Sequence, residues 1–219
     1  MQAIVETLFD AVYLITVITL GIIMIRKSGG NRQYRLFGIM AVVLGLGDSF
    51  HLVPRAIALC TTGLDNFTIA LGLGKLITSV TMTIFYILLY YVWRNRYRID
   101  GRNGITILIF ILSALRIILC LFPQNGWLSA NPPLSWGIYR NIPFTLLGLL
   151  IIVLFYQEAK AQNDTAFRWM WLTIVLSFGF YIPVVLWADA IPMIGMLMIP
   201  KTCAYVWTVL IGYQAMRHE

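Results

Sequence analysis

An acid, an imidazole and a guanidinium follow one another along a single predicted helix, in the segment LGLGDSFHLVPRAIAL at residues 44–59. Asp48, His51 and Arg55 are spaced by three and then four residues, so their side chains share one helical face. A carboxylate beside an imidazole can exchange a proton near neutral pH, and a guanidinium can hold an anion. Because the surrounding residues are apolar, these three side chains are the first candidates for a functional site.

The composition places this candidate site in a membrane. The chain of 219 residues is 60% hydrophobic and only 11% charged, with a mean hydropathy of +0.82. Soluble domains carry about a quarter charged residues, so this chain has too few to cover a surface that faces water. We expect a multi-pass protein of the cell membrane, plasma or inner, whose first partner is the lipid bilayer. The net charge of +7 then reflects membrane topology, and no nucleic-acid partner is expected.

Seven apolar segments are long enough to cross a bilayer, which takes ~20 residues per helix. They are residues 3–25, 36–57, 68–93, 104–122, 134–156, 169–188 and 193–215. Eleven of the sixteen Lys and Arg residues lie in the connections after the first, third and fifth segments and at the end of the chain, and none lies in the opposite connections. This alternation predicts an all-α protein with its N-terminus outside and its C-terminus in the cytoplasm.

The seven segments also suggest an internal repeat of three, one and three helices. The single domain 1–219 divides into a first triplet at 1–97, a linker helix at 104–122 and a second triplet at 134–216. The second segments of the triplets contain FHLVP and FYIP, and the third segments contain Lys75 and Lys201. One linker helix makes the two triplets parallel repeats. This layout resembles the SWEET and PQ-loop sugar transporters and, more distantly, the microbial rhodopsins, which implies a seven-helix membrane fold.

The charges inside the segments all fall in the half that is predicted to face outside, when depth is counted at ~1.5 Å per residue. A charge in hydrocarbon costs at least ~2.5–3.5 kcal/mol, so we expect these side chains to surround one hydrated, outward-facing pocket. Cations outnumber carboxylates, which predicts a small anionic or amphiphilic ligand. The predicted ligand-binding residues are Asp48, His51, Arg55, Lys75, Arg116, Arg140 and Lys201, with Glu6, Asp10 and Tyr181 in secondary roles.

Most of these residues also have a structural role as the alternative to ligand binding. Arg55 and Arg140 are near enough to the interface to reach lipid headgroups, and Glu6 and Asp10 suit the start of a helix. Asp48 has the alternative of a structural ion pair with Lys75 or Lys201. The alternative for His51 is a hydrogen bond between two helices.

Four functions fit this arrangement, and transport of a small solute is preferred because parallel repeats can rock about a central site. A receptor or sensor is the second. The third is an enzyme acting on a lipid-like substrate, with Asp48 and His51 as acid and base. LGDSFHLVP, in the second segment alone, resembles the membrane lysoplasmalogenases, whose aspartate in the GD pair is implied as catalytic; their second aspartate and downstream histidine have no counterpart here.

The fourth function is a retinal-type photoreceptor with a Schiff base on Lys201, for which Asp48 would be the counter-ion. YIPVVLW in the sixth segment resembles the aromatic-proline stretch of the rhodopsins. Apart from this, no cofactor is expected. No metal site is expected either, because His51 is the one histidine inside a segment. The sequence leaves homo-oligomer formation open.

Overall fold

The computed structural model describes residues 2–188 and 190–218, and this part of the chain contains seven long helices and no strand. The helices are α1 (Gln2–Lys27), α2 (Arg32–Cys60), α3 (Thr68–Arg96), α4 (Asn103–Leu121), α5 (Leu134–Ala161), α6 (Met170–Trp187) and α7 (Met198–His218). Three short 3-10 helices lie in the connections: η1 (Leu64–Phe67), η2 (Pro123–Asn125) and η3 (Pro192–Leu197). All seven long helices are long and apolar enough to cross a membrane, which confirms the predicted number of segments.

The two largest differences from the predicted boundaries, of five residues each, have local reasons. α5 continues to Ala161, beyond the predicted end at residue 156, because the polar segment QEAK consists of good helix formers. α7 begins as an α-helix only at Met198, since the preceding turn from Pro192 is a 3-10 helix. Lys201 is therefore the fourth residue of α7 and lies close to its start.

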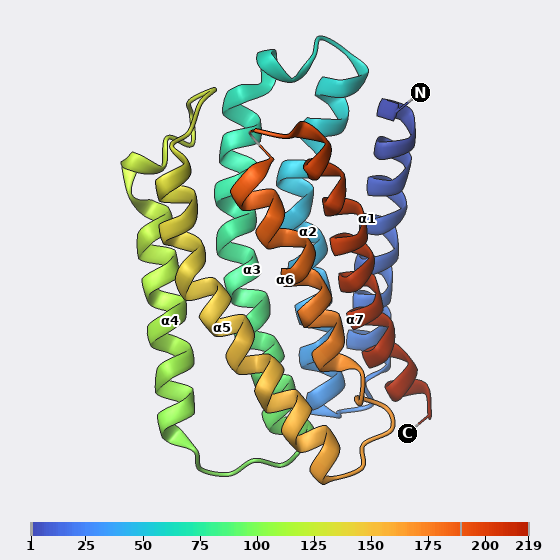
Figure 1. Ribbon diagram of the computed structural model, residues 1–219. Helices are drawn as coiled ribbons and strands as arrows, with labels where there is room; N and C mark the ends of the chain where they lie inside the picture. Colours follow the sequence, from blue (N-terminus) through green and yellow to red (C-terminus); the bar gives the residue numbers. More distant parts are fainter. Residues whose placement is uncertain (1, 189, 219) are drawn as a thin grey trace.

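Consecutive helices run antiparallel, and each packs against the next along the chain (Figure 1). α7 packs against α1, so the seven helices close into a ring, and α3 also reaches α5. We call the end where α1 begins the amino end; it holds the α2–α3, α4–α5 and α6–α7 connections. The opposite end, where α7 finishes, is the carboxyl end. The internal repeat and the side of the membrane that each end faces stay predictions.

Glycines bring α2 and α3 into close contact. A Cβ atom on Gly47 would collide with the side chain of Thr81, and one on Gly74 would collide with the main chain of Phe50. The Thr78 hydroxyl donates a hydrogen bond of 3.0 Å to the main-chain oxygen of Gly47 across the same contact. Small residues thus position α2, which carries Asp48, His51 and Arg55, directly against α3.

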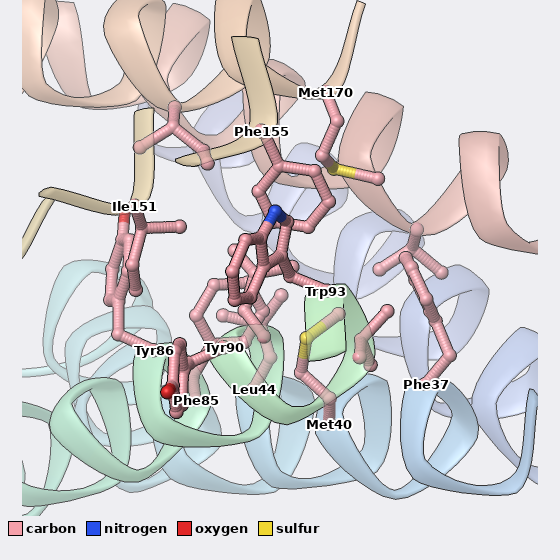
Figure 2. Packing of buried hydrophobic residues seen from close by; sticks show 14 of the residues in the cluster. Phe37, Met40, Leu44, Phe85, Tyr86, Tyr90, Trp93, Ile151, Phe155 and Met170 are labelled. Carbon is pink, nitrogen blue, oxygen red and sulfur yellow. The ribbon is translucent and has the colours of Figure 1, made fainter. Parts of the chain in front are cut away.

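Aromatic side chains pack with methionine, leucine and isoleucine inside the bundle (Figure 2). The residues near the ends of α3 and α5 lie in the half nearer the carboxyl end. Trp93 is fully buried, stacks on Tyr90 at 5.7 Å between ring centroids, and donates from its indole nitrogen to the main-chain oxygen of Leu154 at 3.0 Å. Phe155 stacks on Phe167 at 6.4 Å. We call Tyr90, Trp93, Phe155 and Phe167 the aromatic core. Because it joins α3, α5 and the connection that precedes α6, it closes this half of the bundle by packing.

Candidate functional site

Carboxylates and Arg55 gather where α1 meets α2. The Tyr13 hydroxyl donates a 2.7 Å hydrogen bond to Asp48, and the Arg55 guanidinium forms an ion pair with Glu6. Asp10 lies close enough to Glu6, Arg55 and Asp48 to interact with their charges. Arg55 is therefore bound to α1, in place of the lipid headgroup that its depth also allowed. Three carboxylates share this region with one arginine, so the excess of positive charge must lie elsewhere.

Lys201 is buried between two tyrosine rings. Its side chain is on the inner side of α7, and the residue is only 8% exposed. The ammonium lies 4.9 Å from the ring centroid of Tyr181 and 5.3 Å from that of Tyr205. Asp48 attracts it electrostatically, but no carboxylate oxygen in the described chain lies within 4.0 Å of it. The two aromatic faces thus contribute to its stabilisation, together with Asp48.

Arg116 is a buried cation without a carboxylate partner among the residues that the structure describes. It is 1% exposed, and its Nη1 donates to the main-chain oxygen of Arg140 at 2.7 Å and to Asn141 Oδ1 at 2.8 Å. The guanidinium carbon lies 3.8 Å from the ring centroid of Phe144. Its Nε is buried and has no hydrogen-bond acceptor among the residues that the structure describes. Neutral oxygens and a ring face therefore hold a full positive charge inside the bundle.

Arg140 repeats this pattern at the α4–α5 connection. Its Nη1 donates to Asn125 Oδ1 at 2.8 Å, and its guanidinium carbon lies 4.3 Å from the ring centroid of Trp127. Asn125 is itself fixed, because its amide donates to the main-chain oxygens of Leu119 and Phe122. The loop therefore presents an ordered acceptor to Arg140 but supplies no negative charge.

Tyr181 connects these cations. Its hydroxyl donates a 3.1 Å hydrogen bond to Asn141 Oδ1, the same oxygen that accepts from Arg116, while its ring carries the Lys201 ammonium. Asn141 in turn donates to the main-chain oxygen of Gly137 at 2.8 Å, which orients its amide. We call Arg116, Arg140, Asn141, Tyr181 and Lys201 the cationic cluster. Its net charge is positive, and it lies in the half of the bundle towards the amino end.

His51 contacts α3, and the charges of Lys75, Arg55 and Lys201 act on it. His51 Nδ1 lies 3.3 Å from the main-chain oxygen of Leu71, which is the contact expected of a histidine that bridges two helices. Lys75 is exposed, whereas Lys201 is buried. The two lysines that the predicted repeat places at matched positions therefore have different surroundings. The three side chains on one face of α2 contact different helices: Asp48 and Arg55 contact α1, and His51 contacts α3.

A groove of about 270 Å³ lies between α5 and α6, beside the cationic cluster. Its walls are Ile138, Asn141, Ile142, Thr145, Leu146, Tyr181, Ile182, Val185 and Leu186. Three apolar residues of these walls, Ile142, Leu146 and Ile182, are 52%, 49% and 37% exposed. In a helix that crosses a bilayer, such side chains face lipid, so the groove opens on the lipid-facing surface of the bundle.

Sequence reasoning missed Tyr13 and Asn141, the two residues that hold Asp48 and Arg116. Tyr13 shares one helical face with Glu6 and Asp10, at spacings of four and three residues, and that pattern was a usable signal. Asn141 opens the tripeptide Asn-Ile-Pro, and Tyr181 opens Tyr-Ile-Pro at 181–183. Both segments form the groove.

No group of three or more His, Cys, Asp or Glu side chains in the described residues is arranged to hold a metal ion. Comparisons of the chain with protein-family models, with curated proteins and with solved structures give no match. The fold and the site therefore describe a multi-pass helical membrane protein, and its function has to be inferred from the cationic cluster itself.

Proposed function

We propose that this protein binds a small anionic molecule at the cationic cluster and transports it across the membrane. The observation that carries the proposal is Arg116, a buried guanidinium with no carboxylate partner and a free Nε among the described residues. A buried charge is costly unless it is paired, and a hydrogen bond to neutral oxygen offsets only part of that cost. An anion at the cluster would supply the missing charge, and the planar guanidinium suits carboxylate or phosphate groups.

The orientation of the protein supports access from outside. The basic connections α1–α2, α3–α4 and α5–α6 lie at the carboxyl end, and the positive-inside rule assigns that end to the cytoplasm. The cationic cluster then lies in the outer half of the membrane, where an external solute arrives first. Asp48, held by Tyr13, is the candidate residue for coupling transport to protons.

Transport requires the aromatic core to open after the amino end has closed over the solute. In the structure the aromatic core is fully buried and closes the carboxyl half of the bundle. That closure favours a second candidate function, a receptor that binds the anion from outside and releases it to the same side. The two functions share one binding site and differ only in whether the anion crosses.

Asn141→Asp tests the binding site, because it places a carboxylate 2.8 Å from Arg116 with almost no change of shape. We expect the variant to lose binding of methyl phosphate, measured by calorimetry, because the new carboxylate neutralises Arg116. Asn66→Asp adds the same charge on the exposed η1 and should bind methyl phosphate like the parent. Unchanged methyl phosphate binding in Asn141→Asp would falsify the proposed site.

Flux of labelled methyl phosphate into proteoliposomes separates the two functions. Uptake by the parent that is absent from Asn141→Asp supports transport. Binding without uptake rejects transport and leaves the receptor function.

A further inference from the structure

The α5–α6 groove ends in polar groups that belong to the cationic cluster. Asn141 and Tyr181 line the groove, and the same two side chains contact Arg116 and Lys201. Each is followed by isoleucine and proline, and Ile142 and Ile182 line the groove on either side of them. A group that reaches this polar part lies in the positive field of three cations, and among the described residues Asp48 attracts Lys201.

The rest of the groove is apolar and faces lipid. Ile138, Ile142 and Leu146 recur every four residues and form a continuous apolar strip on α5. Leu146 lies further from the amino end than Asn141, so this strip leads from the polar part towards the middle of the bundle. A molecule that fills the groove therefore needs a polar, negatively charged end and an apolar end.

The size of the groove restricts the ligand to one chain. Its volume of about 270 Å³ is slightly below the range of roughly 300–1,000 Å³ that is typical of small-molecule pockets. A headgroup and the first part of one alkyl chain fit this space, whereas the two chains of a common phospholipid do not. The remainder of the chain would stay in the bilayer, because the groove is open on that side.

We propose that the α5–α6 groove takes up a single-chain anionic amphiphile from the bilayer, with its headgroup beside Asn141 and Tyr181 and its chain along Ile142 and Leu146. The proposal rests on the proposed function and names the class of its ligand. The ligand enters sideways between two helices, and the positive cluster selects it by the charge of its headgroup. Charge complementarity excludes amphiphiles with a cationic headgroup.

Two matched leucines on α5 allow a direct test. Leu146 lines the groove and is 49% exposed, whereas Leu149 is outside it and 52% exposed. In the full chain in phosphatidylcholine nanodiscs, we expect Leu146→Trp to weaken binding of dodecyl phosphate at least tenfold, because the indole fills the chain site. Leu149→Trp should bind it like the parent. Ile182→Trp fills the groove from α6 and should reproduce the effect of Leu146→Trp.

Three probes, measured by native mass spectrometry and calorimetry, distinguish the outcomes. Dodecyltrimethylammonium has the same chain with a cationic headgroup, and methyl phosphate has the headgroup without the chain. The inference is supported if the parent binds dodecyl phosphate but not dodecyltrimethylammonium, and if Leu146→Trp still binds methyl phosphate. It is overturned, with the proposed function intact, if both groove variants bind dodecyl phosphate like the parent while Asn141→Asp loses it. If the parent binds neither phosphate, the proposed function fails as well.

Discussion

Two pairs of arginines, one at each end of the bundle, are held in different ways. At the carboxyl end, Arg96 donates to both oxygens of Asp164, at 2.9 and 3.0 Å, and Arg102 pairs with Glu158 at 3.1 Å. In the half towards the amino end, Arg116 and Arg140 rest on amide and main-chain oxygens. All four of these arginines lie against an aromatic ring, so the carboxylate is the difference between the two pairs.

Arg96 and Arg116 have similar contacts with an aromatic ring. Arg96 lies over Phe167 at 4.8 Å, and Arg116 lies over Phe144 at 3.8 Å. The charges of Arg96 and Arg102 are neutralised by their carboxylate partners, and each pair connects a loop to a helix. A buried arginine held by neutral groups alone keeps its charge available to a ligand, which is why we assign structure to Arg96 and Arg102 and binding to Arg116 and Arg140. The contrast concerns these two pairs, because Arg55 near the amino end pairs with Glu6 and Arg94 near the carboxyl end rests on neutral oxygens.

The first prediction concerns the packing of the carboxyl half, where the largest effect is expected. Trp93→Ala removes a fully buried ring and its hydrogen bond to Leu154, and should lower the free energy of unfolding by about 3–5 kcal/mol. Unfolding in mixed micelles, followed by circular dichroism, measures this change. Trp187→Ala removes the same side chain from a position that is 51% exposed and should cost much less. Equal costs would mean that the aromatic core does not determine stability.

The second prediction breaks the paired arginine. Arg96→Met leaves the Asp164 carboxylate without its two charged hydrogen bonds, and should lower the free energy of unfolding by about 1–3 kcal/mol. Arg35→Met removes an exposed arginine as a control for net charge. A cost no larger than that of the control would show that the pair is not structural.

The same pair predicts how this stability depends on pH. Partial burial alone would raise the pKa of Asp164, but the hydrogen bonds and charge of Arg96 lower it below the ordinary value of 3.8. A lowered pKa in the folded state means that the pair contributes fully above the pKa of the unfolded state and is lost as the pH falls through the folded value. The difference between the parent and Arg96→Met should therefore be constant near pH 6 and shrink below about pH 4.

The third prediction concerns the unpaired arginine, for which the smallest stability change is expected. Arg116→Met should change the free energy of unfolding of the ligand-free protein by less than about 1 kcal/mol, or raise it, because a buried charge is replaced by an apolar chain of similar volume. Binding of methyl phosphate should be lost in the same variant. A destabilisation as large as that of Arg96→Met would instead make Arg116 a structural residue and remove the contrast between the two ends.

The sequence predicted well what depends on local properties. The seven segments were predictable because hydropathy and length are counted along the chain, and the close approach of Gly47 and Gly74 was predictable from residue size. The sequence also separated five cations inside the segments from eleven in the basic connections and at the chain end. It predicted one shared pocket, however, and the structure distributes the residues over a carboxylate region, a cationic cluster and the α2–α3 contact.

By itself, then, the sequence determined that the chain is a seven-helix membrane protein with charges inside its helices, because the composition of each segment decides whether it can cross lipid. Only the tertiary structure decided which charges are paired. Tyr13 and Asp48 are 35 residues apart, and Arg116 and Asn141 are 25 apart, so their contacts depend on which helices are neighbours and how each is rotated. The groove between α5 and α6 likewise exists only because two helices pack side by side, and no single segment contains it.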